Sequence, residues 1–275
     1  MSLDKNDYQE PVCPFDFSQW KEEPAVRQIP VGRVLEKLDE HYSRSDYAAA
    51  VRLAEYWIGE AKYGNDLRGE FAVRNELMGV FRKTGQREKA TDNASLCLEL
   101  IDRMDMNGSV THGTALVNAA TVYKAFGMPE RSLELFRQAE AIYGKELSGS
   151  DYRLASLYNN MSVTLCDLGY FEDAASCQEK ALDILSRVED SEGEQAVSWL
   201  NLADIYEQSR GAEASEEDVR RCCEKAVELL NSATLPRDGN YAFYCEKCAP
   251  VLSYYGFFIA AEELSERAKD IYDRR

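Results

Sequence analysis

The sequence has little of what enzymes and metalloproteins commonly use. It contains 2 histidines, His41 and His112, which lie far apart in the chain. A histidine-based metal site would need partner ligands at a characteristic spacing, and neither residue has them. The motifs of zinc proteases, serine hydrolases and phosphate-binding loops are also missing. We therefore expect no catalytic site, cofactor or histidine-based metal site. The alternative is a catalytic site assembled from residues far apart in the sequence.

Proline is scarce after the first 30 residues. Of the 7 prolines, four lie before residue 31, at Pro11, Pro14, Pro24 and Pro30. Proline removes a backbone donor and interrupts helices, so a chain with so few can form helices nearly throughout. The apolar fraction of 45% is enough for a buried core and too high for a disordered chain.

Basic charge is also in deficit. The 32 Lys and Arg against 49 Asp and Glu leave a net charge of −17. Nucleic acids and anionic membranes need the opposite balance, so neither is expected as a partner. Residues 189–228 concentrate the imbalance, with twelve acidic and four basic side chains. Such a charge favours solubility and permits a basic partner.

Long apolar runs are missing as well. The longest mostly apolar stretch, Ala249 to Ala261, has 13 residues and contains Pro250 and Gly256. It is too short to span a bilayer, and the first 30 residues lack the apolar core of a secretory signal. The sequence therefore predicts a cytoplasmic protein with reduced thiols.

The 8 cysteines allow two interpretations. Cys97, Cys166, Cys177 and Cys223 lie where a helix would bury a small apolar residue. Cys245 and Cys248 form a C-x-x-C pair that follows the adjacent Cys222 and Cys223, so a zinc site is one hypothesis. Zinc sites usually use two spaced pairs, and adjacent cysteines on a helix point about 100° apart. Buried positions on a helical face are the alternative.

A repeat of about 42 residues runs through the chain. Its register is marked by one residue late in each unit, at Trp57, Cys97, Ala139, Ala181, Ala226 and Ala268. Twelve residues before most of these positions stands a turn residue: Ser45, Gly85, Gly127, Gly169 and Gly256. Such a period indicates one supersecondary unit repeated along a solenoid.

The clearest unit covers residues 157–185. Leu157, Met161, Leu165 and Leu168 form one helical stripe before Gly169, which can end a helix in the left-handed conformation. Small or apolar residues then recur at helical spacing after the turn, at Ala174, Cys177, Ala181 and Leu185. Each unit is thus predicted to be a helical hairpin that must stack on its neighbours. In the fifth unit the sequence suggests an extended linker from Gln208 to Glu217, with Ser215 or Asp218 capping the next helix.

These turn glycines, aromatics and alanines resemble the tetratricopeptide repeat. The match is carried by Gly169, Phe171, Ala174 and Ala181, and again by Gly256, Phe258, Ala261 and Ala268. The long unit, with Asn159 and Asn160 in its first helix, looks like the kinesin-light-chain type of this repeat and its bacterial relatives. The resemblance implies an all-α, right-handed α-solenoid of six helical hairpins over residues 31–275.

Residues 1–30 are predicted to form an extension before the repeats. They carry Phe15, Phe17 and Trp20 among prolines. The first interpretation is a cap that packs these aromatics against the first hairpin, since terminal repeats expose an apolar edge. The alternative is a tail that inserts into the groove of the solenoid.

The resemblance also implies a ligand-binding groove lined by the first helix of each hairpin. Amides can pair with the main chain of an extended peptide, and the family's inward-facing position is matched by Asn75 and Asn159. Asn118, Asn160 and Asn201 stand one residue further on, where binding a peptide and bonding between repeats are equally open. Charges lie near the ends of the same helices, at Arg82, Lys83 and Lys124 and at Asp167, Asp204 and Glu207. If they face the groove, one half of it is basic and the other acidic. The equally open alternative is a set of exposed helix ends.

The expected function is a scaffold or adaptor that binds another protein or a peptide in this groove. The alternative is a peptide-sensing regulator whose superhelix changes shape on ligand binding. An enzyme is the third and least supported class. The sequence leaves the ligand and the oligomeric state open.

Overall fold

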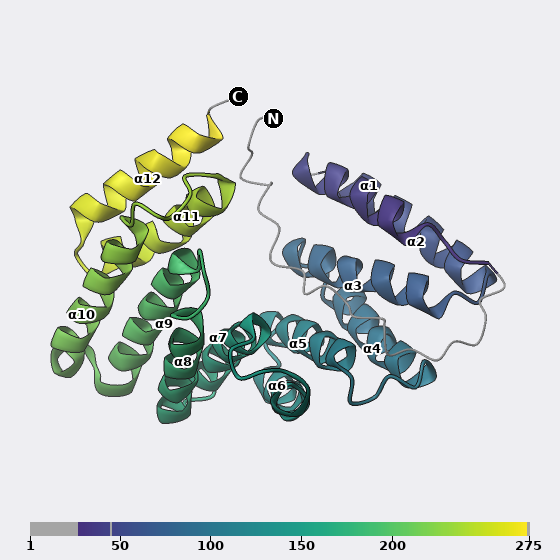
Figure 1. Cartoon of the computed structure of the whole chain (residues 1–275), viewed down its shortest axis with the longest axis horizontal. Coiled ribbons are helices and arrows are strands. Elements are labelled where there is room, and N and C mark those ends of the chain that lie inside the picture. Colours follow the sequence, from purple (N-terminus) through teal and green to yellow (C-terminus); the bar gives the residue numbers. More distant parts are fainter. Residues whose placement is uncertain (1–26, 45, 274–275) are drawn as a thin grey trace. The chain divides into compact units, whose positions relative to one another are not determined.

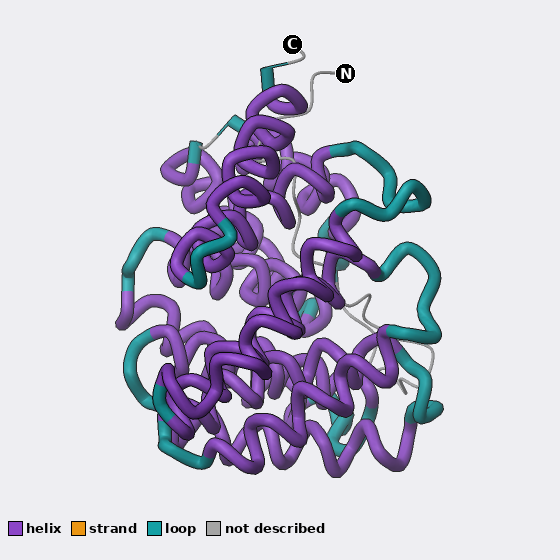
Figure 2. Tube along the Cα trace, turned by 90° about the vertical axis from the view of Figure 1, so that its left-hand side faces the viewer, coloured by secondary structure: helices purple, strands orange, loops and turns teal. Residues whose placement is uncertain are grey.

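The computed structural model describes residues 27–44 and 46–273. Within these ranges the chain forms twelve α-helices and no strand (Figures 1 and 2). They pair into six hairpins: α1 (Val31–Ser43) with α2 (Tyr47–Tyr63), α3 (Leu67–Lys83) with α4 (Arg87–Arg103), α5 (Val110–Ala125) with α6 (Pro129–Glu146), α7 (Tyr152–Asp167) with α8 (Phe171–Leu185), α9 (Glu192–Arg210) with α10 (Ala212–Leu230), and α11 (Gly239–Tyr254) with α12 (Phe258–Tyr272). The predicted all-α fold of six helical hairpins is confirmed.

Two compact units divide the described residues. Those up to Leu147, with α1 to α6, form the N-terminal unit, and those from Ser148, with α7 to α12, form the C-terminal unit. Helix α1, the first helix of the described residues, begins at Val31. Residues 1–26, including the aromatics of the predicted cap, and the turn residue Ser45 lie outside the described residues.

Glycine ends the first helix of four hairpins as the repeat register predicts. Gly85, Gly127, Gly169 and Gly256 have φ of 70°, 72°, 77° and 84°. Side chains other than glycine rarely adopt this left-handed conformation, which reverses the chain within two or three residues. The two helices of each of these hairpins are therefore held antiparallel by a short turn.

The predicted linker in the fifth hairpin is wrong. Helix α9 continues to Arg210, and α10 begins at Ala212, so Gly211 alone joins them, with φ of 80°. Ser215 is buried inside α10, where its hydroxyl donates to the Gly211 carbonyl at 2.8 Å. Glycine supplies the reversal here three residues earlier than the repeat register indicates, and both helices lengthen to 19 residues.

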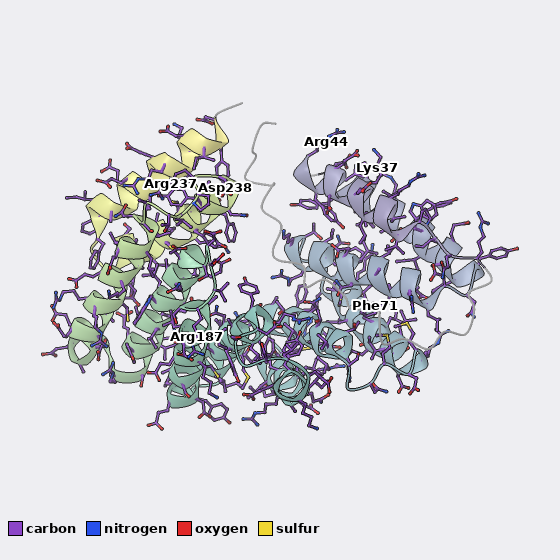
Figure 3. The ribbon with its side chains drawn as sticks, in the orientation of Figure 1. Lys37, Arg44, Phe71, Arg187, Arg237 and Asp238 are labelled. Atoms are coloured by element: carbon purple, nitrogen blue, oxygen red, sulfur yellow. The ribbon has the colours of Figure 1, made fainter. Side chains whose placement is uncertain are left out.

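Small and apolar side chains form the core of each unit. In the fourth hairpin Leu157, Ala174 and Ala181 are fully buried, so the helices approach closely along the predicted stripe. In the N-terminal unit Phe71 of α3, labelled in Figure 3, is also fully buried.

The connection before α11 is held by two labelled residues of Figure 3. The Arg237 guanidinium donates to the Leu230 carbonyl at 2.9 Å and lies 4.0 Å from the Tyr241 ring centroid. The Asp238 carboxylate accepts from the Tyr241 amide at 3.1 Å and caps the helix. The last hairpin is thereby fixed to the end of α10.

The cysteines within the described residues are all buried. Cys222, Cys223, Cys245 and Cys248 are all 1% exposed or less. Burial raises the pKa of the Cys222 and Cys223 thiols to about 12. Among residues 27–44 and 46–273, no group of three or more His, Cys, Asp or Glu side chains is placed to hold a metal ion. Nor is any helix in these ranges both long and apolar enough to cross a membrane.

Candidate functional site

The predicted site residues lie on the first helices of the hairpins, which pack side by side within each unit. Helix α3 lies between α1 and α5, and α9 lies between α7 and α11. The partly exposed sides of these helices are called the first-helix face of each unit. The predicted site residues on these helices are Asn75, Arg82 and Lys83 on α3, Asn118 and Lys124 on α5, Asn159 and Asn160 on α7, and Asn201 and Asp204 on α9.

In the N-terminal unit, the two predicted amides bond to each other. Asn118 Nδ2 donates to Asn75 Oδ1 at 2.8 Å, which joins the first helices of adjacent hairpins. Asn75 is only 7% exposed and also donates to the Glu76 carboxylate. This pair therefore acts as a link between repeats, the second of the two roles considered for Asn118.

A similar link occurs in the C-terminal unit. The Ser198 hydroxyl of α9 donates to Asn159 Oδ1 of α7 at 2.9 Å. Asn160 turns to its own helix, where Nδ2 donates to the Ser156 carbonyl at 2.9 Å. Asn201 is half-buried on α9, and its side chain has no hydrogen bond within the described part of the chain. Of the five predicted amides, Asn201 is thus the one most available to a ligand.

The predicted basic residues are accompanied by acidic ones. Lys83 is exposed, and Arg82 and Lys124 are half-buried. Beside them on α3, burial raises the pKa of Glu76 to about 7, and Asp39 of α1 adds to the increase. Lys83 and the bond from Asn75 lower it in part. The first-helix face of the N-terminal unit therefore contains a carboxyl group that titrates near neutral pH.

The predicted acidic residues do come together in the C-terminal unit. Partial desolvation raises the pKa of Asp204, and repulsion from Glu207 and from Asp167 of α7 adds to this effect. A hydrogen bond from Gln208 at 2.7 Å opposes it. Glu207 in turn accepts from the hydroxyls of Tyr254 at 3.4 Å and Tyr255 at 3.1 Å. These tyrosines are site residues that the sequence analysis missed.

A second missed cluster lies near the start of α9. Glu194 Oε1 accepts hydrogen bonds from the Tyr244 hydroxyl of α11 and, at 3.5 Å, from the Tyr152 hydroxyl of α7. Its Oε2 is buried and has no hydrogen-bond partner within the described residues. Tyr152 and Glu194 are one repeat length apart, 42 residues. That spacing is the sequence signal that could have found the pair.

Comparison with known proteins identifies the repeat. Residues 154–191, which include most of α7 and all of α8, match the model of the tetratricopeptide repeat family. They include the hairpin that the sequence analysis found clearest. No curated protein matches the chain.

Several solved structures share the fold. BtubC (BKLC) from P. vanneervenii is 19% identical, with a TM-score of 0.65 over 75% of this chain and 83% of that one. A putative kinesin light chain from Podosopora anserina, with nearly identical repeats, is 17% identical, with a TM-score of 0.54 over 74% and 96%. RapI in its apo form is 13% identical, with a TM-score of 0.60 over 88% and 97%. Identities this low show a shared fold alone.

The chain is therefore an all-α solenoid of tetratricopeptide-like repeats, with one repeat that the family model detects at residues 154–191. The predicted resemblance to this repeat, including its kinesin-light-chain-like form, is confirmed.

Proposed function

We propose that this protein is a scaffold or adaptor that binds a peptide or protein segment along its first-helix face. The observation that carries the proposal is Asn201. It is a half-buried amide on the central first helix of the C-terminal unit, and its hydrogen-bonding groups are unused within the described residues. An extended peptide offers main-chain donors and acceptors that an amide can satisfy.

The fold supports this function by analogy. Stacked helical hairpins present extended surfaces on which segments of other proteins can lie. Tetratricopeptide repeat families typically act as scaffolds rather than enzymes. The first-helix face has polar side chains repeated from one hairpin to the next, which suits a ligand that runs across several helices.

Charge would select the segment. The proposed face of the N-terminal unit includes Arg82, Lys83 and Lys124, although Glu76 and Asp39 moderate their field. That of the C-terminal unit includes Asp167, Asp204 and Glu207. Steering of this kind acts mainly on the association rate and weakens with added salt.

The test first identifies binding segments on an array of peptides from the proteome. It then compares how alanine substitutions at two asparagines change the affinity for the best segment. Asn201→Ala should weaken the best segment about fivefold, the effect of losing roughly 1 kcal/mol of hydrogen bonding. Asn160→Ala is the matched control, because its amide is already bonded to Ser156, and we expect less than about a twofold change. Equal effects of the two substitutions, or no bound segment at all, would contradict the proposal.

The second candidate is a peptide-sensing regulator, and the division into two compact units favours it. The chain passes from one set of helices to the other through the residues between Glu146 of α6 and Tyr152 of α7. A ligand that prefers one arrangement of the units would shift their equilibrium. Small-angle X-ray scattering with and without a bound segment measures this. An unchanged profile leaves the scaffold as the function.

A further inference from the structure

The turn between α11 and α12 exposes a group of apolar side chains. Tyr254, Phe258 and Ile259 are 71%, 66% and 77% exposed. Among the described residues, six large apolar side chains are more than half exposed, and three of them lie at this turn. Single exposed apolar residues are ordinary, whereas a group of them indicates a surface that binds another molecule.

Carboxylates lie directly beside this apolar group. The rings of Tyr254 and Tyr255 meet edge to face, with centroids 4.9 Å apart. Both hydroxyls donate to Glu207 of α9, at 3.4 Å and 3.1 Å. The carboxylate is thereby held at the edge of the exposed aromatic rings.

Within the described residues, the side-chain contacts of Asp204 and Glu207 are hydrogen bonds, from Gln208 to Asp204 and from Tyr254 and Tyr255 to Glu207. Desolvation raises the pKa of Asp204, the hydrogen bond from Gln208 opposes this, and the charges of Glu207 and Asp167 add to the increase. Arg210, the basic residue at the end of α9, pairs with Asp218 at 2.8 Å and stacks 4.5 Å from the Tyr206 ring centroid. A cation brought by a partner would therefore meet carboxylates without displacing an existing ion pair at Asp204 or Glu207.

The outer face of α12 does not suit packing against a further hairpin or a second copy of the chain. In the fourth hairpin, Ala175 and Leu182 of α8 pack into the core that is shared with α9. The residues at the matching repeat positions in α12 are Glu262 and Lys269, and both are exposed. Burying these charges against another hairpin would be unfavourable. Burying the apolar side chains at the turn carries no such desolvation penalty.

We propose that Asp204, Glu207, Tyr254, Phe258 and Ile259 form an acidic-aromatic surface that binds a cationic amphipathic segment of a partner protein. Lysine or arginine side chains of the segment pair with the two carboxylates and lie over the Tyr254 ring. A cation gains from an aromatic face within roughly 6 Å of its centroid. The apolar side chains between the cations cover Phe258 and Ile259. This inference rests on the proposed function, because it specifies the chemistry of the bound segment.

The test uses the full chain and a fluorescein-labelled peptide of four Gly-Arg-Leu repeats, followed by fluorescence anisotropy at low and high salt. Exchanging arginine for glutamate in the peptide should abolish binding. The double variant Glu207→Gln and Tyr254→Ser should weaken the cationic peptide about tenfold, since it loses an ion pair, a cation–π contact and apolar burial together. Ile259→Ser should weaken it about threefold through the apolar contact alone.

Two matched controls separate this surface from the general acidity of the chain. Glu213→Gln with Glu216→Gln removes carboxylates from the exposed side of α10, and Tyr63→Ser removes a tyrosine that is 83% exposed on α2. Each should change the affinity less than about twofold. If the control and test variants weakened peptide binding equally, the inference would be overturned. The net charge of the chain alone would then account for the binding. Circular dichroism confirms that each variant is folded.

The outcomes also separate this inference from the proposed function. In one outcome, Asn201→Ala weakens the binding of array segments, while Ile259→Ser and the double variant of Glu207 and Tyr254 have no effect. The scaffold function then holds, and the proposed acidic-aromatic surface is wrong. If no segment and no cationic peptide binds, both fail. Binding of the cationic peptide that depends on Tyr254 and Ile259 supports both.

Discussion

Single polar residues of the first helices fall into two groups, those that join the repeats and those that stay available. Asn75 with Asn118, and Asn159 with Ser198, bond across adjacent hairpins. Each such bond contributes about 1 kcal/mol net and fixes how far one helix slides past the next. Asn201 remains available, and the carboxyl groups of Glu76 and Asp204 are held where ionisation is unfavourable.

Glu76 should make the stability of the protein depend on pH near neutrality. Burial, then repulsion from Asp39, raises its pKa from 4.5 to about 7, while Lys83 opposes the increase and Tyr42 faces it from α1. A carboxyl whose pKa is higher in the folded state costs stability as the pH rises from about 4.5 through 7. We expect Glu76→Gln to be more stable than the unaltered protein at pH 8 by on the order of 2 kcal/mol.

Urea unfolding at pH 5 and pH 8 measures this difference. The two proteins should differ much less at pH 5, by about 1 kcal/mol or below, because most Glu76 is protonated there in the folded state. The same gain at both pH values would show that Glu76 is not destabilised by its charge.

At the scale of helices, close approach between hairpins depends on glycine. Gly193 of α9 lies under the Tyr244 ring of α11, and a Cβ at that position would come within 2.1 Å of a ring carbon. This contact brings the Tyr244 hydroxyl to Glu194 and buries the ring to 7% exposure. Gly113 and Tyr143 repeat the arrangement within the third hairpin, with a closest distance of 2.4 Å.

Gly193→Ala should therefore destabilise the protein. The added methyl group has to displace the ring of Tyr244, and overpacking of this kind costs about 1–3 kcal/mol. Gly59→Ala is the control, because Gly59 lies in α2 with nothing within 4 Å of the added Cβ. It should raise stability by up to about 1 kcal/mol through helix propensity. Thermal unfolding followed by circular dichroism measures the sign of the stability change for both substitutions. If Gly193→Ala left the stability unchanged, α9 and α11 could separate at little cost in free energy.

At the scale of the whole molecule, the fold is a series of hairpins, and within each unit neighbouring hairpins contact each other. Stability in such a chain is close to a sum over repeats and the interfaces between them. Damage to one unit should therefore stay near its origin. Phe71, fully buried on α3, allows this to be measured in the N-terminal unit.

Phe71→Ala leaves a cavity in the N-terminal unit and should cost about 3–5 kcal/mol there. Hydrogen exchange followed by mass spectrometry should show faster exchange in α1 to α5 than in the unaltered protein. Helices α9 to α12 of the C-terminal unit should keep their protection. A uniform rise along the chain would instead mean that both units unfold together.

The sequence by itself determined the helices, the number of hairpins and most of their turns. These features depend on short-range rules: Ala174, Ala181 and Leu185 recur at helical spacing, and Gly169 and Gly256 adopt a conformation that side chains disfavour. Gly211 was missed because it occupies a different place in the repeat, so a fixed register could not predict it. The position of each amide on a first helix was predictable for the same local reason.

Only the tertiary structure decided what those side chains contact. Asn118 donates a hydrogen bond to Asn75, Ser198 to Asn159, and Tyr255 to Glu207, across 43, 39 and 48 residues of sequence. The offset between neighbouring helices is set by how their side chains interlock, and a shift of one residue turns an amide by about 100°. Whether an asparagine joins two repeats or faces a ligand therefore depends on packing that no single repeat contains.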